Sequence, residues 1–172
     1  MRCSSAGARG MRVGAPRRFV SRGYGVSWQN RRMGDLDLVL VLRYRKAVTY
    51  GFHMLLGALE EHKTSIRFNV RFGRTMESTA QHIAMARAEG AKVLVLWSFY
   101  SPDAAALGAE LALVRSVADG PEVLHVAGGV HATAEPVQTL DAGWDVAAVG
   151  EGETTLLKLV DAVGDPAGIT GP

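Results

Sequence analysis

Three short apolar runs in the second half of the chain constrain the fold more than any other feature. They read AKVLVLWSF from Ala91, EVLHVA from Glu122 and DVAAVG from Asp145, and a helix-forming segment follows each one. Their aliphatic residues do not alternate with polar ones, which is typical of parallel strands that are buried on both faces. The pattern therefore predicts a parallel α/β sheet, whose ligands bind beyond the carboxyl ends of the strands.

The first half of the chain continues the same alternation of strands and helices. Asp35–Leu42 predicts the first, central strand, and Val48–Glu61 places apolar residues at helical spacing. Ile66–Arg71 alternates apolar and polar residues, so we expect a strand near an edge of the sheet. The other helices are expected over Thr75–Gly90, after Ser101, over Glu135–Ala142 and over Glu153–Val163. Five strands and five helices then form one domain over residues 34–163.

Charge divides the chain into a basic N-terminal segment and an acidic remainder. Met1–Met33 holds 8 of the 19 Lys and Arg residues and no Asp or Glu, and the remaining 11 basic residues face 17 acidic ones, a net charge of −6. We expect the segment to be a disordered tail, an Arg-rich transit peptide or, preferably, residues upstream of a mis-assigned translation start. The acidic domain lacks the basic face that nucleic-acid binding requires.

Cysteine content and hydropathy limit the compartment and the partners. The single cysteine, Cys3, lies in the basic segment, so the domain is expected to have no disulfide and no thiolate site for zinc or an iron–sulfur cluster. No uncharged run approaches the roughly 20 apolar residues of a spanning helix. We therefore expect a cytoplasmic protein with no membrane partner. Residues 164–172 have the Gly and Pro content of a linker.

The sharpest functional signal is the loop that reads GGVHAT over Gly128–Thr133. Two glycines at a strand end remove side chains where an extended or flat ligand approaches the main chain, and the amides that follow favour an anionic group. The alternative is that the pair only makes a tight turn between a strand and a helix. His131 is expected first to organise this loop through hydrogen bonds and second to contact a ligand.

Two further loops follow neighbouring strands. Ser98, Tyr100 and Ser101 offer two hydroxyls and an aromatic ring after the third strand. They do not form the Gly-x-Ser-x-Gly sequence of a serine hydrolase. In the second loop, the run Gly150–Glu153 places two carboxylates at the start of the last helix, where the helix dipole stabilises negative charge. Capping therefore explains these acids as well as ligand binding does, and they are too few for a calcium-type site.

A cluster of cations, Arg43-Tyr44-Arg45-Lys46, follows the first strand. It lies where an anionic ligand group would approach a parallel sheet, so it is a candidate anion site. A solvated basic loop explains it equally well.

At these residues the chain resembles a known family, the cobalamin-binding domain that precedes the radical S-adenosylmethionine barrel in many two-domain enzymes. The resemblance rests on Ser98 after a buried strand, on GGVHATAEP from Gly128, on AGWD from Ala142 and on VGEGE from Val149. It covers about residues 34–172 and is strongest over the second half of the chain.

The resemblance implies a flavodoxin-like fold, a three-layer doubly wound α/β structure with five parallel strands in the order 2-1-3-4-5. It also implies that the nucleotide tail of a corrinoid enters between the sheet and the loops that bear the serine and the glycine pair. The cofactor site predicted in this way comprises Ser98, Tyr100, Ser101, Gly128, Gly129, Val130, His131, Gly150, Glu151 and Gly152.

Two departures from the family shape the functional hypotheses. Members that place a protein histidine below cobalt carry Asp-x-His-x-x-Gly after the first strand, whereas this loop reads RYRKAVTYG from Arg43. We therefore expect either cobalamin without a lower protein ligand or a degenerate docking domain that binds nothing. The barrel is missing, so the iron–sulfur cluster, S-adenosylmethionine and catalysis would belong to another domain or subunit. A flavin or nucleotide-binding domain is the weaker alternative.

Overall fold

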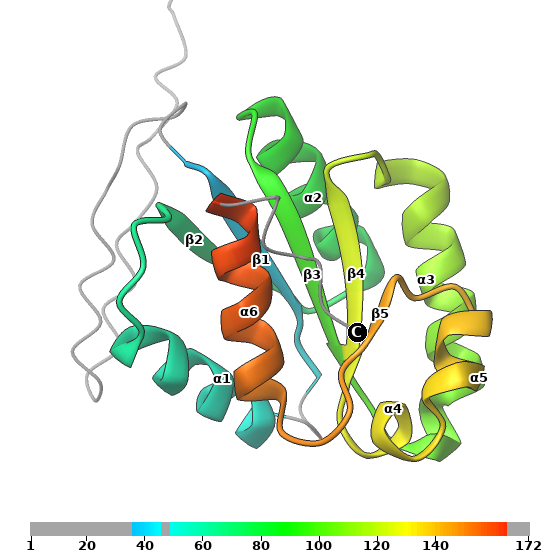
Figure 1. Cartoon of the computed structure of the whole chain (residues 1–172). Helices are drawn as coiled ribbons and strands as arrows, with labels where there is room; N and C mark the ends of the chain where they lie inside the picture. Colours follow the sequence, from blue (N-terminus) through cyan, green and yellow to red (C-terminus); the bar gives the residue numbers. More distant parts are fainter. Residues whose placement is uncertain (1–35, 46–48, 165–172) are drawn as a thin grey trace, which may run out of the picture.

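The aliphatic runs of the sequence form the strands of one parallel sheet, in the order β2-β1-β3-β4-β5 (Figure 1). The strands are β1, Leu38–Arg43, β2, Phe68–Gly73, β3, Lys92–Ser98, β4, Val123–Gly128, and β5, Val146–Ala147. This computed structural model describes residues 36–45 and 49–164. The predicted tail, 1–33, and all but the first residue of the predicted linker, 164–172, lie outside the described residues. The predicted flavodoxin-like sheet is confirmed.

The interior position of β1, between β2 and the central strand β3, follows from its composition. All six of its residues are buried, and successive side chains point to opposite faces of the sheet. Val39 and Val41 belong to the hydrophobic cluster on one face, whereas Leu40 and Leu42 belong to the cluster on the other. The alternating strand β2 lies at an edge, as predicted.

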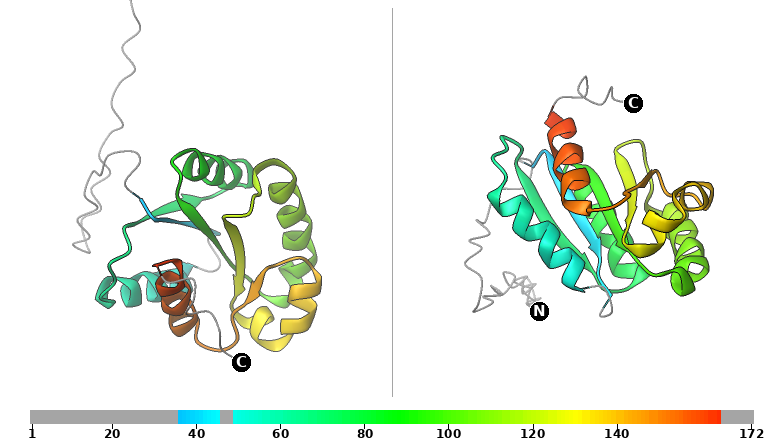
Figure 2. Two further views of the ribbon diagram at one scale, coloured as in Figure 1. Left: turned by 45° about the horizontal axis from the view of Figure 1, so that its top comes forward. Right: turned by 60° about the horizontal axis from the view of Figure 1, so that its bottom comes forward.

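Helices cover both faces of the sheet, which gives three layers (Figure 2). Helices α1, Thr49–Glu61, and α6, Gly152–Gly164, pack side by side on one face. Helices α2, Met76–Ala88, and α3, Ala104–Ala118, pack together on the other. None of the helices in the described ranges has the length and the apolar character needed to cross a membrane.

The loop predicted over Gly128–Thr133 is partly helical. A short helix, α4, Val130–Ala134, begins directly after Gly129, whose φ of 90° turns the chain out of β4. Proline disfavours helical geometry in the residue before it, so α4 ends there and a second short helix, α5, covers Pro136–Asp141. Within the described residues the chain therefore has six α-helices where five were predicted.

Several strands differ from their predicted bounds. β1 was expected from Asp35 and begins at Leu38. β2 was expected over 66–71, but it pairs with β1 in a register that joins Leu38 to Phe68, and it begins two residues later. β5 was expected within the run DVAAVG from Asp145 and has only two residues. The amide of Ala148 still donates to the carbonyl of Ala127 at 2.8 Å, and the chain then leaves the sheet.

Candidate ligand cavity at the carboxyl ends of the strands

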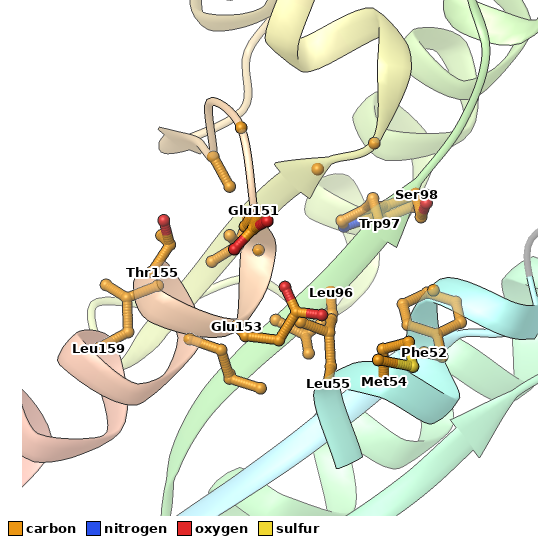
Figure 3. Close-up of a pocket in the computed structure, with 18 of the residues that line it drawn as sticks. Phe52, Met54, Leu55, Leu96, Trp97, Ser98, Glu151, Glu153, Thr155 and Leu159 are labelled. Carbon is orange, nitrogen blue, oxygen red and sulfur yellow. The ribbon is translucent and has the colours of Figure 1, made fainter. Parts of the chain in front are cut away.

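A cavity of about 280 Å³ lies at the carboxyl ends of β3 and β4, between α1 and the start of α6 (Figure 3). Leu96 and Val126 line it from the sheet, and Leu55 and Leu156 line it from the two helices. The volume is close to the lower end of the roughly 300–1,000 Å³ of small-molecule sites. The position agrees with the general rule for ligands of parallel sheets.

The structure brings three of the strand-end loops together around this cavity. Six of the ten predicted site residues line it, namely Ser98, Gly128, Gly129, Gly150, Glu151 and Gly152. The other four, Tyr100, Ser101, Val130 and His131, are not part of the lining. A hydrogen bond of 3.2 Å from the amide of Gly150 to the hydroxyl of Thr133 joins the segments that follow β5 and β4.

The alternation of side chains along β3 explains this division. Leu94 and Leu96 point to the face covered by α1 and α6, so Ser98, two residues later, lies at the cavity. The side chains of Trp97 and Phe99 point to the other face and pack in its core. The burial predicted for Trp97 is thereby confirmed, and side chains that pack against the Phe99 ring lie on the face opposite the cavity.

His131 is one of these residues. Its ring lies 5.4 Å from the ring of Phe99, its Nδ1 atom is 3.1 Å from the hydroxyl oxygen of Ser101, and only 6% of the residue is exposed. Ser101 begins a 3-10 turn, η2, over Ser101–Asp103. His131 therefore joins the start of α4 to η2, which corresponds to the first of the two roles predicted for it.

The two glycines at the end of β4 differ in their surroundings. Gly129 has φ 90° and ψ −167°, and a Cβ atom there would lie 2.9 Å from the hydroxyl oxygen of Ser98 and 3.3 Å from the carbonyl oxygen of Phe99. The turn and its packing therefore require glycine at this position. A Cβ atom on Gly128 would meet nothing nearer than the carbonyl oxygen of Trp97, at 3.8 Å. Of the pair, only Gly128 could accommodate a Cβ atom without a close contact.

Side chains with oxygen atoms give the cavity its polar character. Glu151 and Glu153 contribute carboxylates, and Tyr50, Ser98 and Thr155 contribute hydroxyl groups. In Figure 3 the side chain of Glu153 is turned into the space between α6 and α1, whereas Glu151 lies on the loop before α6. The lining residues in the described part of the chain include no Lys, Arg or His. The lining is therefore mainly apolar, with a few oxygen atoms that can accept hydrogen bonds. Among the described residues it includes no cation.

Sequence reasoning missed the contribution of α1. Tyr50, Gly51 and Met54 line the cavity from the first two turns of this helix. The strand order contains the signal that would have found them: β1 and β3 are neighbours, yet the helices that follow them lie on opposite faces. Ligand crevices open at such switch points, so the start of the first helix is a natural wall of the site.

Both arginines of the cation cluster at the end of β1 are engaged within the protein. Arg43 is buried and forms a two-point ion pair with the carboxylate of Glu110. Arg45 pairs with Asp103, with 3.3 Å between Nη1 and Oδ2. Neither arginine lines the cavity, and Lys46 lies outside the described residues. The described residues thus give no support to the predicted anion site.

No group of three His, Cys, Asp or Glu side chains within 36–45 and 49–164 is placed to hold a metal ion. Comparisons with protein-family models, with curated proteins and with solved structures find no match. The candidate site consequently rests on the geometry described above.

Proposed function

We propose that this protein is a corrinoid-binding domain that holds cobalamin at the carboxyl ends of its strands. The nucleotide tail would enter the cavity, and the corrin ring would cover its mouth. The observation that carries the proposal is the cavity between α1 and α6, which Gly128 lines and where a Cβ atom on Gly128 would make only ordinary contacts. The sequence resemblance to cobalamin-binding domains supports it, because that resemblance involves the same loops.

The cavity lining fits a tail that ends in an apolar bicyclic base. Leu96, Val126 and Leu156 offer aliphatic contacts to the base, and Ser98 offers a hydroxyl group that can donate or accept a hydrogen bond. Gly128 lets the tail lie directly against the main chain of β4. We expect these four residues to hold the tail.

Exposed apolar side chains around the mouth support a place for the corrin ring. Tyr50 and Met54 line the cavity from α1. They are 76% and 47% exposed. Apolar residues that gather around a cavity mark a binding surface, and a flat macrocycle would cover them.

The role of this chain would be to bind and orient the corrinoid and to shield one face of the ring. A bound corrinoid supplies cobalt chemistry such as methyl transfer or rearrangement. The sequence after β1, RYRKAVTYG, contains no histidine, so we expect no lower protein ligand from that loop. We propose that the outer face of the ring serves a radical S-adenosylmethionine domain or subunit in the cytoplasm, which would carry the iron–sulfur cluster.

Two other functions are weaker. The missing histidine motif favours a domain that only docks, but such a domain has no need of the cavity that Gly128 lines. A flavin mononucleotide or another nucleotide would bring a phosphate dianion to a cavity whose charged lining residues, among those described, are Glu151 and Glu153. Cobalamin carries a single phosphodiester charge and a ring with uncharged amides, so it suits this lining better.

Retention of hydroxocobalamin tests the proposal. The protein is mixed with hydroxocobalamin, desalted and scanned in the visible range, and we expect one equivalent of corrinoid to remain bound. Gly51→Leu should weaken binding at least about tenfold, because the new side chain occupies the mouth. Gly57→Leu is the matched control, since Gly57 lies on the same helix, does not line the cavity and also has no atom within 4 Å of its Cβ position. A colourless wild-type protein that is folded by circular dichroism would favour the docking domain instead.

A further inference from the structure

Both glutamates of the cavity belong to its lining, but they differ in position. Glu151 is exposed and precedes α6, whereas Glu153 is partly buried in the first turn of that helix. In Figure 3 the side chain of Glu153 extends from α6 towards Leu96 of β3 and Met54 of α1. Neither carboxylate has an ion-pair or hydrogen-bond partner among the residues that the structure describes. Their oxygen atoms are available to a ligand.

The helix dipole explains only part of this arrangement. The start of α6 stabilises negative charge, which accounts for acidic residues at these positions. It does not account for the direction of the Glu153 side chain, since a carboxylate that served the helix alone would be equally stable turned to solvent. The cavity lining within the described ranges also contains no cation that would neutralise Glu151 and Glu153. The two carboxylates therefore make the electrostatic potential in the cavity negative.

We infer that Glu151 and Glu153 determine specificity by selecting ligand groups that donate hydrogen bonds, above all amides, and by rejecting carboxylates at the same positions. The inference rests on the proposed function and deepens it, because the corrin ring carries a fringe of primary amides. An amide N–H group can donate to either glutamate. A carboxylate in its place has no proton to donate and places like charges side by side, which disfavours binding.

Cyanocobalamin and its monocarboxylates provide the matched ligands for a test. In each of the three monocarboxylates one peripheral propionamide is hydrolysed to the acid, so size and shape change little while a donor becomes an anion. We expect the wild-type protein to bind cyanocobalamin at least about tenfold more tightly than one or more of these acids. Hydrolysis of an amide that does not face the glutamates should leave the affinity unchanged.

The variants Glu153→Gln and Glu151→Gln then assign the effect to the cavity. Glutamine retains an acceptor and adds a donor. In one or both variants the dissociation constant of the monocarboxylate, divided by that of cyanocobalamin, should therefore fall from about ten towards one. Glu60→Gln is the control, because Glu60 is an exposed glutamate near the far end of α1 and does not line the cavity. Dissociation constants from equilibrium dialysis provide the readout.

The possible results separate the two proposals. Wild-type protein that binds cyanocobalamin and all three monocarboxylates equally well would overturn the selectivity while leaving corrinoid binding intact. The same conclusion follows if the ratio stays unchanged in both glutamine variants. Wild-type protein that retains no corrinoid at all would overturn the proposed function, and the inference would fall with it.

Discussion

The indole nitrogen of Trp97 donates a hydrogen bond of 3.2 Å to Nδ1 of His125, and both side chains are buried on the face of the sheet opposite the cavity. The bond requires a neutral imidazole that carries its proton on Nε2. Burial, together with the positive charge of Arg115, lowers the pKa of His125 to about 4, although Asp119 and Asp145 oppose this shift. The pairing therefore depends on pH.

We predict that acid weakens the fold through His125. In the unfolded chain a histidine takes up its proton near pH 6.5, whereas in the folded protein His125 stays neutral until about pH 4. The unfolded state thus binds more protons within this window, and stability is lost as the pH falls through it. The loss attributable to this group is at most about 3 kcal/mol.

Urea unfolding at pH 7, 5.5 and 4.5 measures this loss. His125→Gln should be less stable than the wild type at pH 7 and should lose less stability on acidification, because glutamine does not titrate. His62→Gln is the control, since His62 is a partly exposed residue of the α1 C-terminal end that pairs with Asp161. Identical pH profiles for the wild type and His125→Gln would contradict the prediction.

The glycine pair after β4 should respond unequally to alanine. Gly129→Ala places a Cβ atom 2.9 Å from the hydroxyl oxygen of Ser98 at a positive φ, so we expect a loss of about 1–3 kcal/mol in the free energy of unfolding. Gly128→Ala makes only ordinary contacts and should change it by less than about 0.5 kcal/mol. Chemical denaturation of the two variants decides the matter, and equal losses would argue against the different roles assigned to these glycines.

Alanine should stabilise α1 at both of its interior glycines. Gly51→Ala and Gly57→Ala each fill open space on the helix, so each should raise the free energy of unfolding by about 0.5–1 kcal/mol. Denaturant midpoints would show the gain. A loss of stability at Gly57 would indicate that this surface packs against something outside the described residues.

The buried arginine of β1 should matter more for stability than its exposed neighbour. Arg43 holds Glu110 of α3 and donates to the carbonyl oxygen of Arg74 at 2.9 Å, so Arg43→Met leaves several acceptors without their partner. We expect a loss of about 2–3 kcal/mol. Arg45→Met breaks a partly exposed ion pair with Asp103 and should cost less than about 1 kcal/mol. Thermal unfolding of both variants provides the comparison, and the reverse order would contradict it.

The sheet could be predicted because strands that are buried on both faces have apolar residues at every position. The run from Val93 to Trp97 has no exposed face, and the edge strand keeps polar residues such as Arg71 between apolar ones. Helix α4 shows no comparable sequence pattern. Its five residues, Val130–Ala134, are too few to show helical periodicity, and the two glycines before it are typical of a loop.

The site could be predicted only in part, because sequence gives strand ends more readily than side-chain directions. Parallel strands end at one edge, which is why the loops with Ser98, Gly128 and Glu151 meet. Counting side chains in steps of two from Leu96 would also have separated Ser98 from the residues near Phe99. The cavity itself depends on how far α1 and α6 stand apart, and hydrophobic periodicity does not contain that distance.

The central claim is that the cavity receives the nucleotide tail of cobalamin, and a comparison of cobalamin with cobinamide tests it most directly, because cobinamide lacks that tail. Gly128→Val narrows the cavity without a close contact at its Cβ position. We predict that this substitution raises the Kd of cobalamin at least about tenfold and leaves the Kd of cobinamide unchanged. Equal effects on both ligands, or none on cobalamin, would contradict the account.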